Sequence, residues 1–481
     1  MSAGVRKQRL LALRWRVVES LRSSTLARLL LGAARIVRGA ARLAAGRRYD
    51  ALEDWCSVGR VVRIAPLARV ARRMAGKEFD AACGPPGAPR PLAENLLLEE
   101  IRNGPAAREH LRWLAAQKGL RKPTLGGDLL VLKSPDPATG ERGVLLLKYS
   151  NSMVRFLCVY DVARVLDAYQ LVLEPSWVGY EDPVFHLFLD RDRHVVVQAH
   201  QRDDFAYLSG LRSNLVPVST GSSYWVDERT FRPLDGREKK YLAVMVANWI
   251  PLKRHEVLLR AFARLPRGPE KLALVGFPWE GFTRERIDDM IRRAGLADRV
   301  DVFEWLRPEE LNVVFNQSHA NVLLSHKEGG NKAVFEGLFA GVPCVVAETH
   351  VGIRREDVND ATGLRATDEG LAEALAAVRS GARTFTPREW ALRNASSGNS
   401  TRLVEEALRE AAARDGLPWT RSILAKVNRP FARYEDPSAW QETLPRYREL
   451  AGALREGAPG AASAPEAWDP AELDRLGETA S

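Results

Sequence analysis

The sequence predicts an α/β protein in which two doubly wound domains face a cleft, preceded by a basic helical extension. Short apolar runs alternate with amphipathic segments from about residue 127 to residue 384, as in parallel sheets covered by helices. A charged, turn-rich segment at 235–240 divides this region in two. The chain has 481 residues, 46% of them hydrophobic, which is enough for two domains with appended segments.

The pattern divides the chain into five segments. They are a basic helical extension with a Pro/Gly linker (1–91), a first α/β domain (92–235), a second α/β domain (241–384), a helical segment (385–457) and a disordered tail (458–481).

Local periodicity places the individual elements. The expected strands are 128–133, 143–148, 171–173, 194–199 and 215–218 in the first domain, and 241–247, 272–276, 300–303, 321–324 and 343–347 in the second. The expected helices are 92–119, 152–169, 203–211, 253–265, 285–293 and 308–317, followed by one after residue 330 and by helices from residue 385 onward.

The net charge of +10 lies entirely in residues 1–50, which carry twelve basic and two acidic side chains. The rest of the chain is balanced and gives no reason to expect nucleic-acid binding. Arginines alternate with apolar residues and Trp15, and no run is long enough to span a membrane. An amphipathic helix on an anionic membrane is one interpretation. A helix packed on the protein itself, a helix that pairs with a partner and a mitochondrial transit peptide are the alternatives.

The four cysteines are scattered and show neither metal-ligand spacing nor a disulfide framework. This pattern favours a reducing, cytoplasmic compartment, with peripheral attachment to the inner membrane face as an option for the basic leader. No metal or other cofactor is expected.

The most informative stretch is NVLLSHKEGGNKAVFEGLFAGVPCVV at 321–346. An apolar run ends in a turn with Glu328, and Gly329 and Gly330 follow before a helical segment that carries Glu336. Loops at the carboxyl ends of parallel strands are where open α/β sheets bind ligands. Glycines let the backbone approach a ligand, and amides at a helix start suit a diphosphate.

The spacing of Glu328 and Glu336 resembles the E-x7-E motif of retaining glycosyltransferases with the GT-B fold, in particular family four (group 1). The resemblance implies two Rossmann-like domains, the first (92–235) on the acceptor side, and final helices (385–457) that pack back on the first domain. It further implies transfer of a sugar from a nucleoside-diphosphate donor to a hydroxyl group. It also implies that Glu336 holds the ribose, that Glu328 lies near the sugar, and that the backbone from Gly329 to Asn331, with Lys332 beside it, contacts the diphosphate.

The resemblance covers roughly residues 170–380 and assigns further donor-binding residues. Lys253 matches the lysine of a basic pair that grips the diphosphate, whereas Asn248 replaces the arginine of that pair. Arg254 is a candidate substitute for the lost cation, and Gly276 matches a turn glycine near the nucleotide. The alternative for Lys253 is a solvated lysine at a helix start.

In the first domain, His200 ends a predicted strand and resembles the histidine that contacts the donor sugar, with a surface histidine as the alternative. Glu174, Trp177 and Tyr180 follow another strand and are candidates for binding the acceptor. A buried aromatic corner, with Glu174 capping a turn, is equally compatible with that segment. Residues 149–151 occupy the place of the glycine-rich acceptor loop of the family without its glycine pair.

The expected partners are a nucleotide-sugar donor and a glycan, lipid-linked or small-molecule acceptor, in bacterial polysaccharide, glycolipid or envelope glycan synthesis. An epimerase or phosphorylase with the same architecture is one alternative. Another is a catalytically silent, membrane-associated nucleotide-sugar-binding or scaffold protein, which Asn248 and the missing acceptor glycines motivate.

Overall fold

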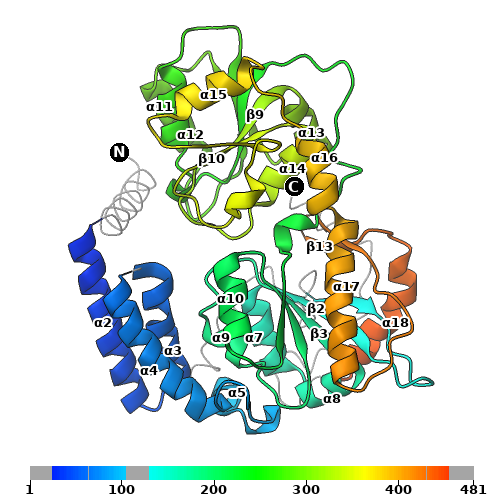
Figure 1. The fold of residues 1–481 in the computed structure, drawn as a ribbon. Coiled ribbons are helices and arrows are strands. Elements are labelled where there is room, and N and C mark those ends of the chain that lie inside the picture. The colour runs from blue at the N-terminus through cyan, green and yellow to red at the C-terminus, as the bar shows by residue number, and fades with distance from the viewer. Residues whose placement is uncertain (1–23, 63, 104–128, 430, 454–481) are drawn as a thin grey trace.

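The computed structural model describes residues 24–62, 64–103, 129–429 and 431–453. Two α/β lobes lie one above the other, each built around its own sheet (Figure 1). The predicted α/β fold class with a helical N-terminal extension is confirmed. Most of the basic leader, the tail from residue 454 and much of the helix expected at 92–119 lie outside the described residues.

The first sheet is simpler than the doubly wound pattern expected for it. Its strands lie in sequence order, and β1 is antiparallel to β2 while the other pairs are parallel. Successive right-handed crossovers to the next strand leave the connecting helices on one face of a sheet. The strands are β1 (Leu129–Lys133), β2 (Gly143–Lys148), β3 (Tyr169–Glu174), β4 (Val195–Gln198) and β5 (Leu215–Val218).

The connecting segments of the first lobe form short helices: α7 (Ser150–Val159), α8 (Val162–Ala168), α9 (Pro183–His186) and α10 (Arg202–Gly210). The single helix expected at 152–169 is therefore two helices. The chain breaks at Asp161, whose carboxylate caps α8 by accepting a hydrogen bond from the Arg164 amide at 3.3 Å.

The second sheet is fully parallel, with the order β11-β10-β9-β6-β7-β8. This is a doubly wound sheet in which the strand order reverses between β6 and β9. Its strands are β6 (Tyr241–Val246), β7 (Lys271–Gly276), β8 (Val300–Glu304), β9 (Ser318–Leu323), β10 (Cys344–Ala347) and β11 (Gly363–Ala366). Its helices are α11 (His255–Ala263), α12 (Arg284–Arg293), α13 (Pro308–Asn316), α14 (Lys332–Phe339) and α15 (Leu371–Arg379).

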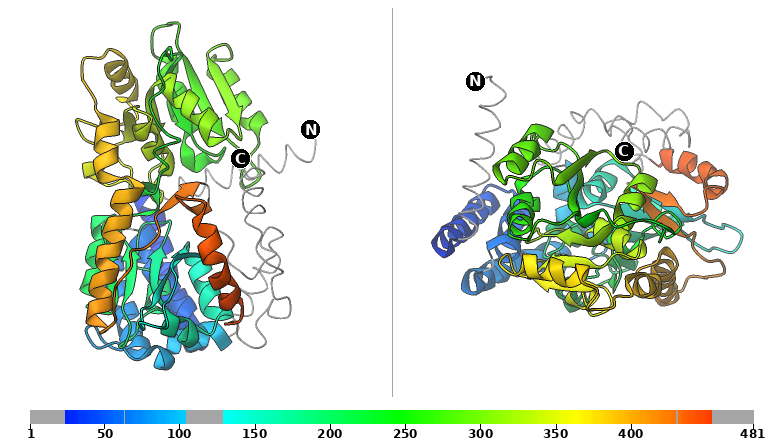
Figure 2. Two further views of the ribbon diagram at one scale, coloured as in Figure 1. Left: turned by 90° about the vertical axis from the view of Figure 1, so that its right-hand side faces the viewer. Right: turned by 90° about the horizontal axis from the view of Figure 1, so that it is seen from above.

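The C-terminal segment runs from the second lobe back along the first. Helix α16 (Pro387–Asn394) leads into α17 (Ser397–Arg414), which lies along the lower lobe (Figure 2). Val404 and Leu408 of α17 belong to the core cluster that covers the face of the first sheet opposite its connecting helices. The tail was expected to be helical, but besides α18 (Ala439–Ala451) it contains the hairpin β12 (Lys426–Arg429) and β13 (Phe431–Tyr434).

The N-terminal extension packs beside the first lobe (Figure 1). It comprises α2 (Thr25–Ala44), α3 (Arg48–Ser57), a π-helical turn (Val58–Val62), α4 (Ala65–Cys83) and α5 (Leu96–Asn103). Gly39 of α2 lies so close to Trp55 that an added Cβ would overlap the indole ring. None of the described helices is both long and apolar enough to cross a membrane.

Candidate functional site

Two loops meet where the strand order of the second sheet reverses, the place where doubly wound sheets bind ligands. The loop after β6 carries Lys253, and the loop after β9 carries Glu328. The Lys253 ammonium lies 2.7 Å from Glu328 Oε2. Asn331 caps α14 by accepting from the Val334 amide, and its side-chain amide donates to the same Glu328 oxygen at 3.0 Å. The structure therefore brings together three of the predicted donor-side residues.

Glu328 is an ionised carboxylate with unused hydrogen-bonding capacity. Its burial opposes ionisation, but Lys253 and hydrogen bonds from Ser325 and Asn331 outweigh burial and hold the pKa of Glu328 below its ordinary value. Its Oε1 is buried and has no partner among the described residues. A buried acceptor without a partner is costly in the free protein, so this oxygen suits a hydroxyl group of a ligand.

His350 is a second polar group near Glu328, and no sequence motif predicted its place in the site. Its Nδ1 lies 2.7 Å from the Ser325 carbonyl oxygen, to which it donates as a neutral ring. Burial lowers the pKa of His350 to about 4, and Nε2 is left without a partner among the described residues. An unprotonated Nε2 adds another hydrogen-bond acceptor to the site.

Gly329 and Gly330 allow the two lobes to approach each other closely. A Cβ at Gly329 would overlap the carbonyl oxygen of Ser176 in the first lobe. A Cβ at Gly330 would lie 2.5 Å from Ser223 Oγ and 3.4 Å from His200 Cε1. These glycines are therefore required by close packing between the lobes as well as by any approach of a ligand.

His200 lies at this contact between the lobes, although it is engaged. Its Nε2 is 2.7 Å from the carbonyl oxygen of Gly352 in the second lobe, which also accepts from the Gln201 side chain at 2.7 Å. Burial lowers the pKa of His200, so the ring is neutral and donates this bond. The structure places His200 beside the glycine loop as a link between the lobes, and a ligand hydroxyl would have to replace Gly352 as its partner.

The candidate substitute cation, Arg254, points away from the site. Its guanidinium donates to the Leu324 carbonyl at 3.0 Å and forms an ion pair with Asp368. The side chain is buried, and its backbone has a positive φ of 62°. In this arrangement the charge of Arg254 is engaged by Asp368 within the second lobe, and its contact with a diphosphate stays a prediction.

Asn248 and Gly276 lie in a cavity of about 310 Å³ at the carboxyl ends of β6, β7 and β8, with Lys253 at its edge. Asn248 Oδ1 is buried without a partner among the described residues. A Cβ at Gly276 would overlap the Ala247 carbonyl oxygen. The family pattern has an arginine at this position, whereas this cavity offers the Oδ1 atom of Asn248, a hydrogen-bond acceptor, in its place.

Two aromatic residues line the same cavity and were not predicted individually. Trp305 stacks on Phe277, with ring centroids 4.5 Å apart and planes 22° apart. Trp305 is 44% exposed and has a φ of 54°, a region that a bulky side chain rarely adopts. Phe277 follows the end of β7 at Gly276, and Trp305 follows the end of β8 at Glu304. This position after a strand was the only feature of the sequence that could have predicted their place in the cavity.

Glu336 and Lys332 pair with each other on α14, with Lys332 Nζ 2.9 Å from Glu336 Oε1. Lys332 Nζ also donates to the carbonyl of Asn428 in the C-terminal hairpin at 3.1 Å. Glu336 is almost fully buried. A ribose could bond to Glu336 only by sharing it with Lys332.

Two of the three acceptor candidates are inside the protein. Glu174 is fully buried, with Lys426 Nζ 2.7 Å from its Oε2. Tyr180 is buried and donates to the Gln198 carbonyl at 2.9 Å. Burial speaks against acceptor binding by these two residues, and the alternative of a buried Trp/Tyr corner is met by Tyr180 alone. Trp177, by contrast, is 57% exposed and its backbone lies against Gly329.

The buried ion pair under this loop was invisible in the sequence, because Lys426 is far from Glu174 along the chain. Burial lowers the pKa of Lys426 to about 7, against the opposing effect of Glu174. Lys426 Nζ also lies 4.1 Å from the centroid of the Trp225 ring. No group of three or more His, Cys, Asp or Glu side chains is arranged as a metal site in the described part of the chain.

Comparison with known proteins agrees with these features. Residues 226–379 match the family model of glycosyl transferases group 1. Solved structures that resemble this chain include sucrose-phosphate synthase from Thermosynechococcus elongatus (19% identity, 56% of this chain and 74% of that one, TM-score 0.44). They also include Anabaena Alr3699/HepE in complex with UDP (15% identity, 55% and 78%, TM-score 0.45). None of the curated proteins matches. Residues 226–379, about a third of the chain, therefore match the group 1 glycosyl transferases, and the activity of the whole chain is a proposal.

Proposed function

We propose that the chain transfers a sugar from a nucleoside-diphosphate sugar to a hydroxyl acceptor with retention of configuration. The observation that carries this proposal is the Lys253–Glu328 pair at the point where the strand order reverses, with the first turn of α14 beside it. A lysine and helix amides suit a diphosphate. Glu328 Oε1, which has no partner in the part of the chain that the structure describes, suits a sugar hydroxyl.

In the proposed reaction, the bond between the anomeric carbon and the diphosphate oxygen breaks, and the acceptor oxygen forms the new bond on the same face. The acceptor proton passes to the departing diphosphate. Lys253 and the backbone from Gly329 to Asn331 stabilise the negative charge that develops there, and charge stabilisation of this kind is a large contribution to catalysis. Glu328 orients the sugar and is not a nucleophile.

The first test is a screen of the purified protein against UDP, GDP, ADP and their sugars. We expect one nucleotide to raise the melting temperature, because a ligand that binds only the folded state stabilises it. Slow hydrolysis of the matching sugar donor should accompany this. If no nucleotide stabilises the protein, the site assignment fails and the silent scaffold becomes the better interpretation.

The cavity beside Asn248 is the proposed site of the base, with Trp305 as its stacking surface. Replacing Trp305 with alanine should weaken nucleotide binding by about tenfold, because stacking of a base on an aromatic ring contributes roughly 1–3 kcal/mol. Isothermal titration calorimetry with the nucleotide from the screen measures this. Trp279→Ala is the comparison, since Trp279 is 51% exposed against 44% for Trp305 and contacts Phe277 edge-on, but is not among the residues that line the cavity. Equal affinity of the wild type and Trp305→Ala would place the base elsewhere.

We further propose that the protein is cytoplasmic and attaches peripherally to an anionic membrane, where it serves bacterial polysaccharide, glycolipid or envelope glycan synthesis. Helix α2 packs on the protein through Gly32 and Gly39. Its other face exposes Leu26, Leu30 and Val37 at 65–69%. An exposed apolar face on a basic helix suits a bilayer interface.

The triple substitution of Leu26, Leu30 and Val37 by serine should reduce binding to liposomes that contain phosphatidylglycerol by about tenfold or more, since each buried CH₂ contributes about 0.8 kcal/mol. Co-sedimentation measures the bound fraction. A Val70→Ser variant, on an exposed position of α4, controls for general loss of surface hydrophobicity. If the triple variant binds as well as the wild type, α2 is not the membrane contact.

A further inference from the structure

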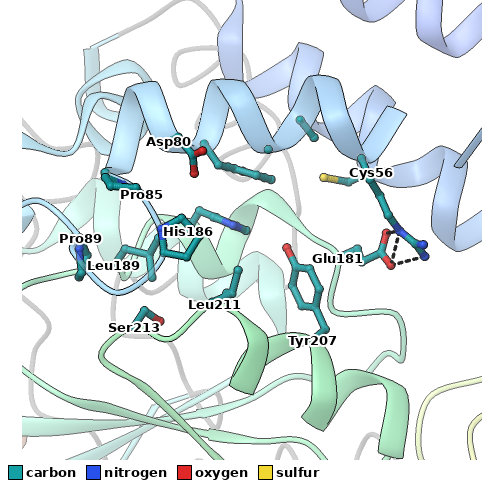
Figure 3. Close-up of a pocket in the computed structure, with 16 residues that line it drawn as sticks. Cys56, Asp80, Pro85, Pro89, Glu181, His186, Leu189, Tyr207, Leu211 and Ser213 are labelled. Atoms are coloured by element: carbon teal, nitrogen blue, oxygen red, sulfur yellow. Dashed lines mark hydrogen bonds and ion pairs between the residues drawn. The ribbon is translucent and has the colours of Figure 1, made fainter. Parts of the chain in front are cut away.

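A second cavity, of about 190 Å³, lies between the N-terminal extension and the first lobe (Figure 3). Helix α4 forms its roof, and the segment from α9 to the end of α10 forms its floor. Most of the lining is carbon, from Phe79, Pro85, Leu189 and Leu211 among others. At about 30 Å³ for a group the size of a water or a methylene, it has room for a chain of roughly six methylene groups.

One buried polar side chain that lines this apolar space has a ring nitrogen with no partner in the described part of the chain. His186 is 1% exposed, its ring stacks on Phe79 with centroids 3.4 Å apart, and its Nδ1 has no hydrogen bond among the described residues. The backbone of Asp182 lies close to the ring without giving Nδ1 a well-formed bond. Burial lowers the pKa of His186 to about 3, so the ring is neutral at physiological pH.

The Tyr207 hydroxyl points into the same space (Figure 3). A neutral imidazole and a phenol can each donate or accept a hydrogen bond, but neither balances a charge. Arg72, at the rim, is already paired with Glu181 at 2.6 Å. The cavity therefore fits an apolar chain that carries one uncharged hydroxyl or ester oxygen, and it disfavours a carboxylate.

The cavity lies directly behind the loop that was expected to bind the acceptor. Glu181, on its rim, follows Tyr180 and is five residues beyond Ser176, which touches Gly329. The extension also reaches the donor site: Lys327, the neighbour of Glu328, donates to the Arg60 carbonyl at 3.3 Å. A chain held in the cavity is thus anchored against the segment that contacts the Gly329 loop of the second lobe.

We propose that this cavity holds the hydrocarbon chain of a lipid acceptor, with an uncharged oxygen of that lipid bonded to His186 or Tyr207. The proposal rests on the proposed transferase function and names its acceptor class. The cavity and the exposed leucines of α2 belong to one helical extension, so the same segment would contact the membrane and receive a lipid from it.

The test uses Gly76, which lines the cavity in the middle of α4 and has no atom within 4 Å of an added Cβ. Gly76→Leu adds a side chain whose Cβ meets no described atom within 4 Å, and leucine favours the helix over glycine. Gly398→Leu is the matched control, because Gly398 is also helical, has the same free space and is remote from the cavity. We expect 1-octanol, whose last carbons would extend beyond the space for about six methylene groups, to bind the wild type and Gly398→Leu equally. Gly76→Leu should bind it at least about tenfold more weakly, since a leucine displaces two or more methylene groups. Titration calorimetry measures the affinities.

Two further measurements test the polar group. His186→Phe keeps the flat ring beside Phe79 but removes the nitrogen, so octanol affinity should fall by about three- to tenfold. Octanoate should bind the wild type more weakly than octanol does. If octanol does not bind, or binds Gly76→Leu as tightly as the wild type, the cavity is not a chain site. Equal affinity for octanoate and octanol would overturn the uncharged-oxygen assignment.

The acceptor role is tested with octyl and methyl glycosides as paired acceptors and the donor from the nucleotide screen. The wild type should show a lower KM for an octyl glycoside, and Gly76→Leu should lose that preference while its nucleotide affinity stays unchanged. Equal KM values in the wild type, or no transfer to any octyl glycoside, would overturn the acceptor assignment. If the wild type binds no nucleotide, the transferase function itself is contradicted. Failure of the acceptor assignment and failure of the transferase function are therefore distinguishable.

Discussion

Replacing Glu328 with glutamine is expected to lower kcat/KM for sugar transfer by about 100- to 1000-fold, the range seen when one preorganised polar contact in an active site is lost. Glutamine keeps the size of the side chain and one carbonyl oxygen, but it removes the negative charge that pairs with Lys253 at 2.7 Å. Its amide group also replaces one of the two oxygens that the carboxylate presents. The sugar would therefore lose its orienting acceptor, and Lys253 would lose the partner that fixes its position.

Steady-state kinetics with the donor from the screen, together with the melting temperature, separates this effect from misfolding. Glu336→Gln provides a comparison on the neighbouring helix. We expect it to raise the KM for the donor more than it lowers kcat, because a ribose contact is made in the ground state and in the transition state alike. If Glu328→Gln keeps the wild-type kcat/KM, Glu328 takes no part in the reaction, and its ion pair with Lys253 is only structural.

Replacing Gly329 with alanine is the second change with a large expected effect. The new Cβ would overlap the Ser176 carbonyl oxygen, which is backbone and has no rotamer to move aside. The two lobes would have to separate at this loop, and a misplacement of about 1 Å in a catalytic arrangement can reduce turnover by about 100-fold. Nucleotide affinity should change much less, because the nucleotide site proposed here lies within the second lobe.

Gly330→Ala is the informative comparison, because its Cβ would meet the end of the Ser223 side chain at 2.5 Å, and that side chain can rotate. Its effect should be clearly smaller than that of Gly329→Ala. Gly398→Ala, with no atom within 4 Å of the new Cβ, controls for the substitution itself. If Gly329→Ala keeps wild-type kcat, close approach of the lobes at this loop is not needed for the reaction.

The sequence predicted much of the second lobe because the signals there are local. Apolar runs of four to seven residues, each followed by a turn and an amphipathic stretch, define a strand and its helix over short distances. Once the strands are parallel, their carboxyl ends share an edge, and Lys253 and Glu328 are then expected near each other. Asn331 could be anticipated in the same way, since asparagine before a helix is a favoured cap.

The first lobe was predicted less completely, for a physical reason. Its sheet is closed on one side by α17 and a hairpin that follow the second lobe in the chain, so the environment of its strand ends depends on residues far away in sequence. Glu174 was expected at the cleft, yet Lys426 buries it through an ion pair. Local patterns carry no information on such a pairing.

The sequence by itself determined the α/β class, the strand–loop–helix unit that carries Glu328, and the concentration of positive charge before residue 51. Only the tertiary structure decided which polar groups face the site. It paired Arg254 with Asp368, left Glu328 Oε1 and His350 Nε2 without partners within the described ranges, and enclosed a cavity between α4 and the first lobe. These outcomes depend on packing between segments remote in the chain, because burial and pairing are properties of the assembled core and not of any local run of residues.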